Sequence, residues 1–262
     1  MINNNVLGDG IGSVEFIDSM GDDLRVVNVA RVSFNQHTDH LRQKDRNLIR
    51  FLARGMSAHD MEQLLIEAAG SEDFEVLRDV FDRMMVDTHW TPFSHVQITM
   101  RLKMPIFVAR QWFKHQIGFT RNEVSRRYVK ATPQIYLPDQ WRKAAANVKQ
   151  GSSEELVTHC GARRVLDHPS QRAHEVYDEA LHQYESLLNA GVCAEQARMV
   201  LPQAMYTEFY ETGSLAAYAR LIRQRTDSHA QKEIQAYALA VKEAIKDVAP
   251  VSLHALLNPV SI

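Results

Sequence analysis

The segment 94–104 reads SHVQITMRLKM and carries the clearest structural pattern in the chain. Its apolar residues stand at every second position, between polar or charged ones: Val96, Ile98, Met100, Leu102 and Met104. Successive side chains of a strand point to opposite faces of a sheet, so this period of two predicts a strand with one buried face and one face in water. One-sided strands of this kind are typical of antiparallel sheets.

The residues after this strand predict a helix, a strand and two more helices. Pro105 stands where the first residue of a helix belongs, because its fixed φ suits that position, and a helix is expected over 106–115. Residues 206–212 alternate again and predict another strand. Helices are expected behind it, at about 214–225 and 229–248.

The residues before the strand predict both kinds of element. Two β-rich segments, 14–17 and 24–30, flank a turn at 21–23. Apolar residues at helical spacing predict a helix over 44–54, which Gly55 ends.

Three further helices are expected. Ser57 and Asp60 have the spacing of a capping box, so one helix begins there. Apolar residues at helical spacing follow over 74–84, and 171–189 has the stripe of an amphipathic helix. Helices mixed with antiparallel-type strands, without a regular β-α-β alternation, favour an α+β fold. We expect an antiparallel-type sheet flanked by helices, in a single domain over 1–262.

Composition excludes several classes of protein. The 262 residues carry a formal net charge of −2, which argues against a nucleic-acid binder with a strong basic excess. Two cysteines without CxxC spacing, Cys160 and Cys193, argue against a disulfide scaffold or a metal site. The N-terminus has no apolar core of a signal peptide, and no run of about 18 apolar residues suggests a membrane span. We therefore expect a cytoplasmic protein that binds no metal and no membrane.

The densest polar stretch is 110–128, directly after the predicted strand and helix. It offers arginines, a carboxylate at Glu123, an imidazole at His115 and a hydroxyl at Ser125. Arginine donates several hydrogen bonds to phosphate in one plane, so this stretch suits a phosphorylated ligand. A solvated basic loop without any ligand explains its composition equally well.

Two other stretches combine arginine with further polar groups. The segment 223–231 contains Arg225, His229 and a possible helix cap, and capping alone does not explain the first two. The segment 197–202 places Arg198 in apolar surroundings, where a salt bridge is the simpler explanation. The sequence contains no GxGxxG, P-loop, HExxH or GxSxG motif, so a nucleotide would be held by side chains rather than by a glycine-rich loop.

Together these stretches resemble the flavin-dependent thymidylate synthase family. The frame of its signature is present as Gln111-Trp112-Phe113-Lys114-His115-Gln116 and Asn122-Glu123-Val124-Ser125-Arg126-Arg127-Tyr128. The segments 197–202 and 225–231 are similar to two other family motifs, and 30–33 and 91–95 to two more. The resemblance runs from about residue 24 to about 248.

The signature itself departs from the family's Arg-His-Arg, seven residues, then Ser. Lys114 and Gln116 replace the two arginines, and eight residues separate Gln116 from Ser125, as in some bacteriophage members. Arg121 beside the extra residue is a candidate to replace the lost charge. Segments at about 55–87 and 142–170 look longer than in compact relatives and are expected to be peripheral helical insertions.

The resemblance implies roles for individual residues. Those expected to hold deoxyuridine monophosphate are Gln111, Lys114, Glu123, Ser125, Arg126, Arg127, Arg198 and Arg225. Arg225 would sit against the uracil and act as the catalytic residue. Those expected to contact FAD are Thr91, Lys114, His115, Gln116, Glu123, Ser214, Leu215, Ala216 and Arg220. His89 and His229 are further candidates for the flavin or folate site.

The implied reaction methylates deoxyuridine monophosphate to deoxythymidine monophosphate. Its cofactor is FAD, with NADPH and 5,10-methylenetetrahydrofolate as co-substrates, and the implied assembly is a homotetramer with active sites at subunit interfaces. Two alternatives stay open. Cys193 near Arg198 permits a cysteine-dependent thymidylate synthase without flavin. The basic residues from Arg121 to Lys130 permit a non-enzymatic nucleic-acid-binding module.

Overall fold

One antiparallel sheet organises the protein. The computed structural model describes residues 2–84, 88–146, 151–160 and 168–259. The sheet has the strand order β1-β2-β3-β7-β4, and each neighbouring pair is antiparallel. Its strands are β1 (Ile2–Asn3), β2 (Ser13–Met20), β3 (Gln97–Pro105), β7 (Tyr206–Ser214) and β4 (Phe119–Glu123). A separate two-stranded ribbon pairs β5 (Arg142–Ala144) with β6 (Ser152–Leu156).

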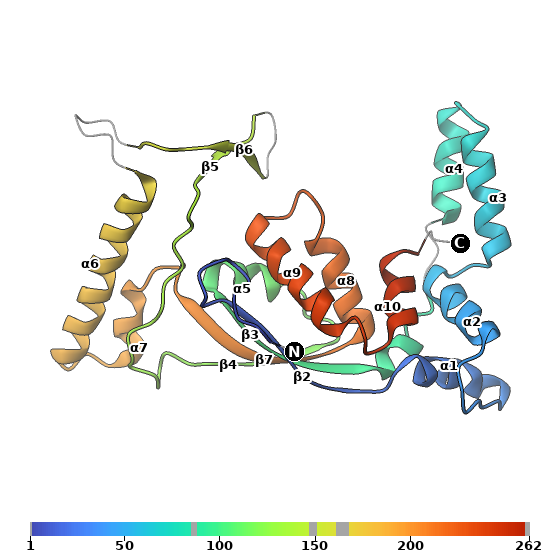
Figure 1. Ribbon diagram of the computed structural model, residues 1–262, viewed down its shortest axis with the longest axis horizontal. Helices are drawn as coiled ribbons and strands as arrows, with labels where there is room; N and C mark the ends of the chain where they lie inside the picture. The colour runs from blue at the N-terminus through green and yellow to red at the C-terminus, as the bar shows by residue number, and fades with distance from the viewer. Residues whose placement is uncertain (1, 85–87, 147–150, 161–167, 260–262) are drawn as a thin grey trace.

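Four helices lie on one face of this sheet, as Figure 1 shows. They are α5 (Ile106–Trp112), α8 (Leu215–Arg225), α9 (Lys232–Ile245) and α10 (Pro250–Leu257). The core between the two layers is formed by buried side chains such as Met100, Leu102 and Phe209 from the strands and Leu221 and Tyr237 from the helices. The sheet and this helix layer share one core and together position the polar residues of the candidate site.

The opposite face of the sheet is polar, as the alternation in 94–104 predicted. On β3 and β7 the residues facing away from the helices include Arg101, Glu208 and Tyr210. Arg101 donates from Nε to Glu208 at 2.6 Å across the two strands. The guanidinium also lies 6.0 Å from the Tyr210 ring centroid. Cross-strand pairs of this kind stabilise an exposed sheet face by a few tenths to about 1 kcal/mol each.

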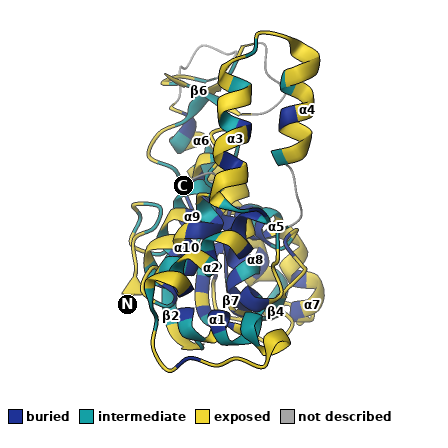
Figure 2. Ribbon diagram, turned by 90° about the vertical axis from the view of Figure 1, so that its right-hand side faces the viewer, coloured by how far each residue is buried: buried dark blue, intermediate teal, exposed yellow. Residues whose placement is uncertain are grey.

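The remaining helices extend beyond the two ends of the sheet (Figure 1). Near β2 lie α1 (Asp23–Arg31), α2 (Gln43–Arg54), α3 (Ala58–Ala69) and α4 (Phe74–Met84), with the short helices η1 (Val32–Phe34) and η2 (Pro92–His95). At the other end lie α6 (Pro169–Asn189), α7 (Ala194–Ala197) and η3 (Arg198–Val200). Figure 2 shows α3 and α4 rising from the body with mostly exposed residues. Their own small core is centred on Met61, Leu64 and Val80.

Two helix ends were predicted correctly, at Gly55 and Ser57, whereas α9 begins at Lys232 with Gln231 as its N-cap rather than at residue 229. Gly55 ends α2 with φ of 80°, a left-handed conformation that glycine adopts without strain. The Ser57 side chain accepts a hydrogen bond from Asp60 N and caps α3. Ser214 caps α8 in the same way, through Ala217 N at 3.2 Å. The strand predicted at 94–104 is confirmed from Gln97 on as β3, since Ser94 and His95 belong to η2, and the strand predicted at 206–212 is confirmed as β7.

The prediction of a β-rich segment at 24–30 was wrong, because those residues form α1. Asp22 caps this helix by accepting from Arg25 N at 2.9 Å. Val26 and Val27 are fully buried in the core. Valine favours strands only weakly, and burial against neighbouring elements overrides that preference.

Three other predictions need correction. The loop expected around Gly118 contains β4, which pairs with β7. Pro105 is the last residue of β3 and the N-cap of α5 rather than its first residue, and α5 ends at Trp112 instead of residue 115. Helical character holds for 58–69 and 74–84 but not for 142–144 and 152–156, which form β5 and β6. Residues 85–87, 147–150 and 161–167 of the two expected insertions lie outside the described residues.

The amphipathic helix predicted at 171–189 is confirmed as α6, but its apolar stripe is only partly covered. Tyr184 is fully buried, whereas 63% of Val176 is exposed. Within the described ranges, no helix has the length and apolar character needed to cross a membrane.

Candidate functional site

The end of α5 and the end of α8 bring the two strongest sequence motifs together. Arg225, the last residue of α8, donates from Nε to His115 Nε2 at 2.8 Å. It also donates from Nη2 to the Gln111 carbonyl oxygen at 3.2 Å. The Gln111 side chain in turn donates from Nε2 to Gln231 Oε1 at 2.6 Å. Residues far apart in the chain thus form one connected polar cluster, which we call the Arg225 cluster.

The Arg225 cluster combines a cation with neutral partners. His115 is buried, and its pKa is lowered from 6.5 to about 4 by burial and by the nearby Arg225, Arg220 and Arg121. The imidazole is therefore neutral near pH 7. Burial lowers the pKa of Arg225, but a guanidinium still stays protonated. Among the described residues no carboxylate forms an ion pair with Arg225, so its charge stays available to a ligand.

A buried carboxylate lies next to this cluster and binds Trp112, the residue that follows Gln111. Glu211 on β7 is fully buried and accepts from Trp112 Nε1 at 3.1 and 3.2 Å. It also pairs with Arg121, its direct partner in the register of β4 and β7. Burial raises the pKa of Glu211, while Arg121 and Trp112 oppose that rise. The Arg121 guanidinium lies 5.2 and 4.8 Å from the ring centroids of Phe113 and Phe119.

Arg121 therefore fixes β4 and α5 against β7 and does not supply a free charge to the signature loop. Trp112, the tryptophan of the Gln-Trp motif, has a structural role as donor to the buried carboxylate. Sequence reasoning missed Glu211. Its position on the apolar side of an alternating strand is the only signal that could have found it.

A cavity of about 800 Å³ opens beside the Arg225 cluster. Its lining includes Gln111, Arg225, Ser228, His229 and Gln231 on one side and Arg142, Ser152 and Glu154 of the ribbon on the other. The ribbon is fastened to α9 by Arg142, which pairs with Glu233 at 2.8 Å, and by Glu154, which pairs with Lys232 at 2.6 Å. No sequence motif marked Arg142, Ser152 or Glu154, which thus form one wall of the cavity.

Arg127 and Arg198 meet at a different place. Arg127 Nε lies 3.3 Å from the Glu195 carboxylate, and Arg198 Nε donates to the Glu195 carbonyl oxygen at 3.2 Å. Both arginines are exposed, as is Glu195. Ser125 shapes this loop by accepting from Arg127 N at 3.3 Å. The structure therefore brings these two predicted phosphate ligands together at Glu195. We call Arg127 and Arg198, with the Glu195 that both contact, the Glu195 pair.

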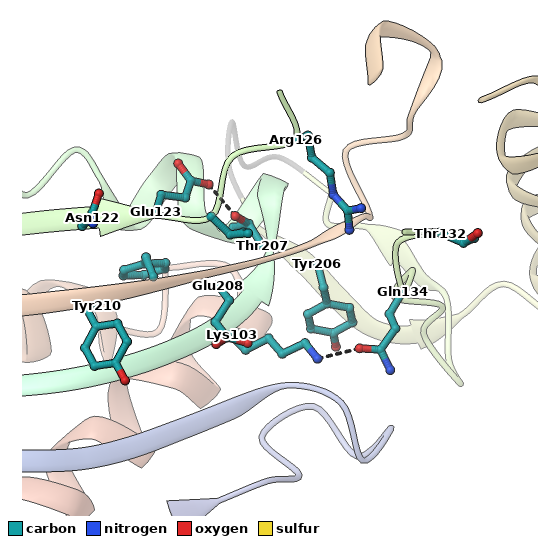
Figure 3. Close-up of a pocket in the computed structure, with 12 residues that line it drawn as sticks. Lys103, Asn122, Glu123, Arg126, Thr132, Gln134, Tyr206, Thr207, Glu208 and Tyr210 are labelled. Carbon is teal, nitrogen blue, oxygen red and sulfur yellow. Dashed lines mark hydrogen bonds between the residues drawn. The ribbon is translucent and has the colours of Figure 1, made fainter. Parts of the chain in front are cut away.

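Glu123 and Arg126 line a third region, on the polar face of the sheet. The cavity there measures about 560 Å³ and is also lined by Lys103, Gln134 and Tyr210. Figure 3 shows Glu123 receiving a hydrogen bond from Thr207, and Lys103 donating to Gln134. Arg126 donates to the Ala131 carbonyl oxygen. Arg225 does not line this cavity.

His89 and Thr91 line a cavity of about 740 Å³ at the other end of the molecule, between α1 and η2. Apolar side chains form part of its surface: Val29, Val32, Leu52 and Pro92. Polar groups come from Asn28, Ser33 and His95. The matched segment 30–33 could have pointed to Ser33 as a ligand contact, whereas no sequence signal marked Asn28.

The predicted FAD residues at the start of α8 have unequal access. Ser214, Ala216 and Arg220 line a small cavity of about 260 Å³ beside Gly118. Leu215 is fully buried in the core, so its side chain does not face a ligand. Arg220 donates from Nη2 to the Ile117 carbonyl oxygen at 2.6 Å.

Three other predicted residues are exposed. Lys114 and Gln116 flank the buried His115. His229 lies 2.9 Å from Asp227 and lines the cavity beside Arg225. Of the two cysteines, Cys193 is exposed and Cys160 is half-buried. No group of three or more metal-ligating side chains occurs in the part of the chain that the structure describes.

Comparisons with known proteins agree on one family. Residues 15–251 match the family described as thymidylate synthase complementing protein. The chain is 34% identical over 247 residues to the flavin-dependent thymidylate synthase of Thermotoga neapolitana, covering 94% of this chain and 91% of the relative. It is also 34% identical to that of Thermus thermophilus, covering 92% and 74%. Among solved structures, it is similar to the UMP/dUMP methylase PolB of Streptomyces cacaoi bound with 5-Br dUMP. That match has a TM-score of 0.66 and 28% identity, and covers 92% of this chain and 93% of PolB.

Proposed function

Since the chain belongs to the flavin-dependent thymidylate synthase family, we propose that it converts deoxyuridine monophosphate to deoxythymidine monophosphate, with methylenetetrahydrofolate as carbon donor and NADPH as reductant. FAD is the cofactor of this enzyme family. Family membership also makes the cysteine-dependent mechanism and the nucleic-acid-binding alternative unnecessary, since neither involves flavin.

The state of Arg225 is the observation that carries the proposal. Its guanidinium is half-buried and lines the 800 Å³ cavity, and among the described residues its hydrogen-bond partners are the neutral His115 and the Gln111 carbonyl. C5 of uracil reacts as a nucleophile toward the methylene carbon, so the ring must gain negative charge before the new carbon–carbon bond forms. A fixed cation beside that ring stabilises the charge as it develops, because the donor is already oriented and partly shielded from water.

The phosphate would be held elsewhere by Arg127 and Arg198, with Ser125 and Arg126 nearby. These arginines offer charge-assisted hydrogen bonds once a phosphate competes with Glu195 for them. Gln111 would act through its amide, which already lies in the Arg225 cluster.

The cavity between α1 and η2 fits part of FAD. Val29, Val32 and Leu52 offer apolar surface to a flat ring, while Ser33 and Thr91 offer hydroxyl groups. When bound, FAD supplies the reducing equivalents for the transfer. The chain's own contribution is to bind and orient the nucleotide and to keep Arg225 charged.

We further propose that the complete site forms between subunits of a homotetramer. Within one chain, Arg225 lines the cavity at the ribbon, while Arg126 and Thr91 line two other cavities. The partly uncovered stripe of α6 and the polar sheet face offer surface for neighbouring copies. A neighbouring copy that contributes to each site would join groups that a single chain keeps apart.

The test is a reconstituted assay of the full chain. Protein loaded with FAD is given NADPH, methylenetetrahydrofolate and deoxyuridine monophosphate, and nucleotide products are separated by chromatography. We expect bound flavin absorbance, NADPH oxidation that responds to the nucleotide, and thymidylate. Protein that binds FAD and nucleotide but forms no methylated product would refute the proposal. Uridine monophosphate is tested in parallel, because PolB is described as a UMP/dUMP methylase.

A further inference from the structure

We propose that His115 is a positioning residue that holds Arg225 in its working orientation as an uncharged acceptor. This inference rests on the proposed function, since Arg225 is assigned there to the uracil. It gives His115 a role through Arg225 that is distinct from a contact with flavin.

The geometry requires one arrangement of protons. Arginine only donates hydrogen bonds, so His115 Nε2, 2.8 Å from Arg225 Nε, must accept. A neutral imidazole that accepts at Nε2 carries its proton on Nδ1. The second anchor, from Arg225 Nη2 to the Gln111 carbonyl oxygen at 3.2 Å, is neutral as well. Two fixed neutral acceptors therefore define the plane of the guanidinium.

An uncharged anchor matters because of what a carboxylate would do in its place. An ion pair with aspartate or glutamate would also orient Arg225, but it would cancel the charge that the reaction needs. Elsewhere in this protein arginines do pair with carboxylates, as Arg121 does with Glu211 and Arg142 does with Glu233. Arg225 differs from them because its hydrogen-bond partners within the described ranges are both neutral.

The surroundings keep His115 neutral. It is buried, and the charged groups that act on it are Arg225 and Arg220 of α8 and Arg121 of β4. Glu211 is already paired with Arg121, and Asp227, which lines a pocket together with Arg220 and Arg225, bonds to His229. Burial and three cations all oppose protonation, which lowers the pKa of His115 to about 4. The acceptor is therefore present throughout the neutral pH range.

Three substitutions separate an uncharged acceptor from the other possible roles. His115→Gln places an amide oxygen near the Nε2 position, His115→Leu removes the acceptor and keeps an apolar side chain, and His115→Glu adds a charged acceptor. We expect His115→Gln to retain kcat within about fivefold of the parent. Losing a hydrogen bond to a charged group corresponds to a loss of about 10- to 100-fold, which we expect in kcat for His115→Leu. We expect His115→Glu to lose at least as much, because it neutralises Arg225.

Binding measurements distinguish the alternatives. Flavin content and the KM for deoxyuridine monophosphate should stay within a few-fold of the parent in all three variants. If His115 instead acts by contacting flavin, FAD occupancy should fall in parallel with activity. If its role is only structural, kcat should follow the melting temperature across the three variants. Either result, or equal kcat for the Gln and Leu variants, would overturn the inference. A parent that makes no thymidylate would refute the proposed function separately.

Stability measured against pH gives a readout independent of turnover. Between about pH 6.5 and 4 the unfolded chain protonates His115 while the folded chain does not, so this residue lowers stability as the pH falls. His115→Gln removes that contribution. The variant should therefore lose less stability than the parent between pH 7 and 5. An identical pH dependence in the two proteins would contradict a neutral buried His115.

Discussion

The Arg225 cluster and the Glu195 pair are both expected to hold the same nucleotide, yet they differ in what occupies their guanidinium groups. Arg225 is half-buried against two neutral acceptors, His115 and the Gln111 carbonyl. Arg127 and Arg198 are exposed and converge on Glu195. In the Arg225 cluster the guanidinium is fixed in place and its positive charge is not paired with a carboxylate of the described residues. In the Glu195 pair a ligand must compete with Glu195 for the two guanidinium groups.

This difference suits the two tasks. Charge that develops during a reaction is best stabilised by a donor that does not reorganise, and burial strengthens that donor. A phosphate is charged from the start, so exposed arginines can bind it by exchanging partners. Substitutions at both places test this division of roles, beginning with Glu211, the buried carboxylate next to the Arg225 cluster.

The largest effect is expected from Glu211→Ala. Removing one partner of a buried ion pair leaves an uncompensated charge, here on Arg121, and costs about 3–5 kcal/mol of folding free energy. Trp112 loses its acceptor as well. Urea unfolding at a fixed protein concentration measures the change. The matched control is Glu208→Ala on the exposed face of the same strand, where loss of the Arg101 pair should cost about 1 kcal/mol or less. Equal losses in the two variants would show that the buried pair contributes no more than an exposed one.

The next effect concerns catalysis. Arg225→Ala should lower kcat by about 10²–10³-fold, as is found when a donor to developing charge is removed. FAD should stay bound, because α8 keeps its buried face. The control is Arg223→Ala, which removes an exposed charge from the same helix. If Arg225→Ala lowers the melting temperature while turnover per folded enzyme is retained, Arg225 is a structural residue instead.

Much of the body of this fold could be predicted from local sequence, and the failures have identifiable causes. The alternation in 94–104 and the caps at Gly55 and Ser57 depend on neighbouring residues, so both were predicted correctly. The helix α1 was not predicted, because its valines favour a strand until Asp22 caps the segment and the core buries it. The strand β4 is short and charged, and only its partner β7 makes it a strand.

The candidate site shows the same difference between features that local sequence predicts and features that depend on tertiary contacts. The motif around Gln111 and His115 is a local signal, and the structure brings both residues into contact with Arg225. The pairing of Arg121 with Glu211 depends on the register of two strands about ninety positions apart, which the sequence does not reveal. The wall that Arg142 and Ser152 contribute depends on where the ribbon docks, which is likewise a tertiary property.

A smaller effect should follow at the Glu195 pair. Arg127→Ala and Arg198→Ala should each weaken binding of deoxyuridine monophosphate by about 1.5–3 kcal/mol, as expected for a charge-assisted contact. Deoxyuridine, which has no phosphate, should bind the parent and both variants equally. Calorimetric titration with the two ligands measures both quantities. Equal losses for nucleotide and nucleoside would place these arginines away from the phosphate.

The smallest effect has the opposite sign and tests whether Glu195 competes with the ligand. Glu195→Gln removes the carboxylate that lies 3.3 Å from Arg127 and leaves the backbone carbonyl that accepts from Arg198. An exposed ion pair is worth at most about 1 kcal/mol, so the Kd for deoxyuridine monophosphate should fall by up to about fivefold. The gain should shrink at high salt, because screening weakens exposed charges.

The control for Glu195→Gln is Glu179→Gln on α6, which changes the net charge equally at an exposed residue that bonds to Gln183. This control should leave the Kd unchanged. If Glu195→Gln weakens nucleotide binding instead, Glu195 helps to arrange the two arginines for the phosphate rather than competing with it. The contrast with Arg225 would then lie in burial alone, since both sites would be preorganised before the nucleotide arrives.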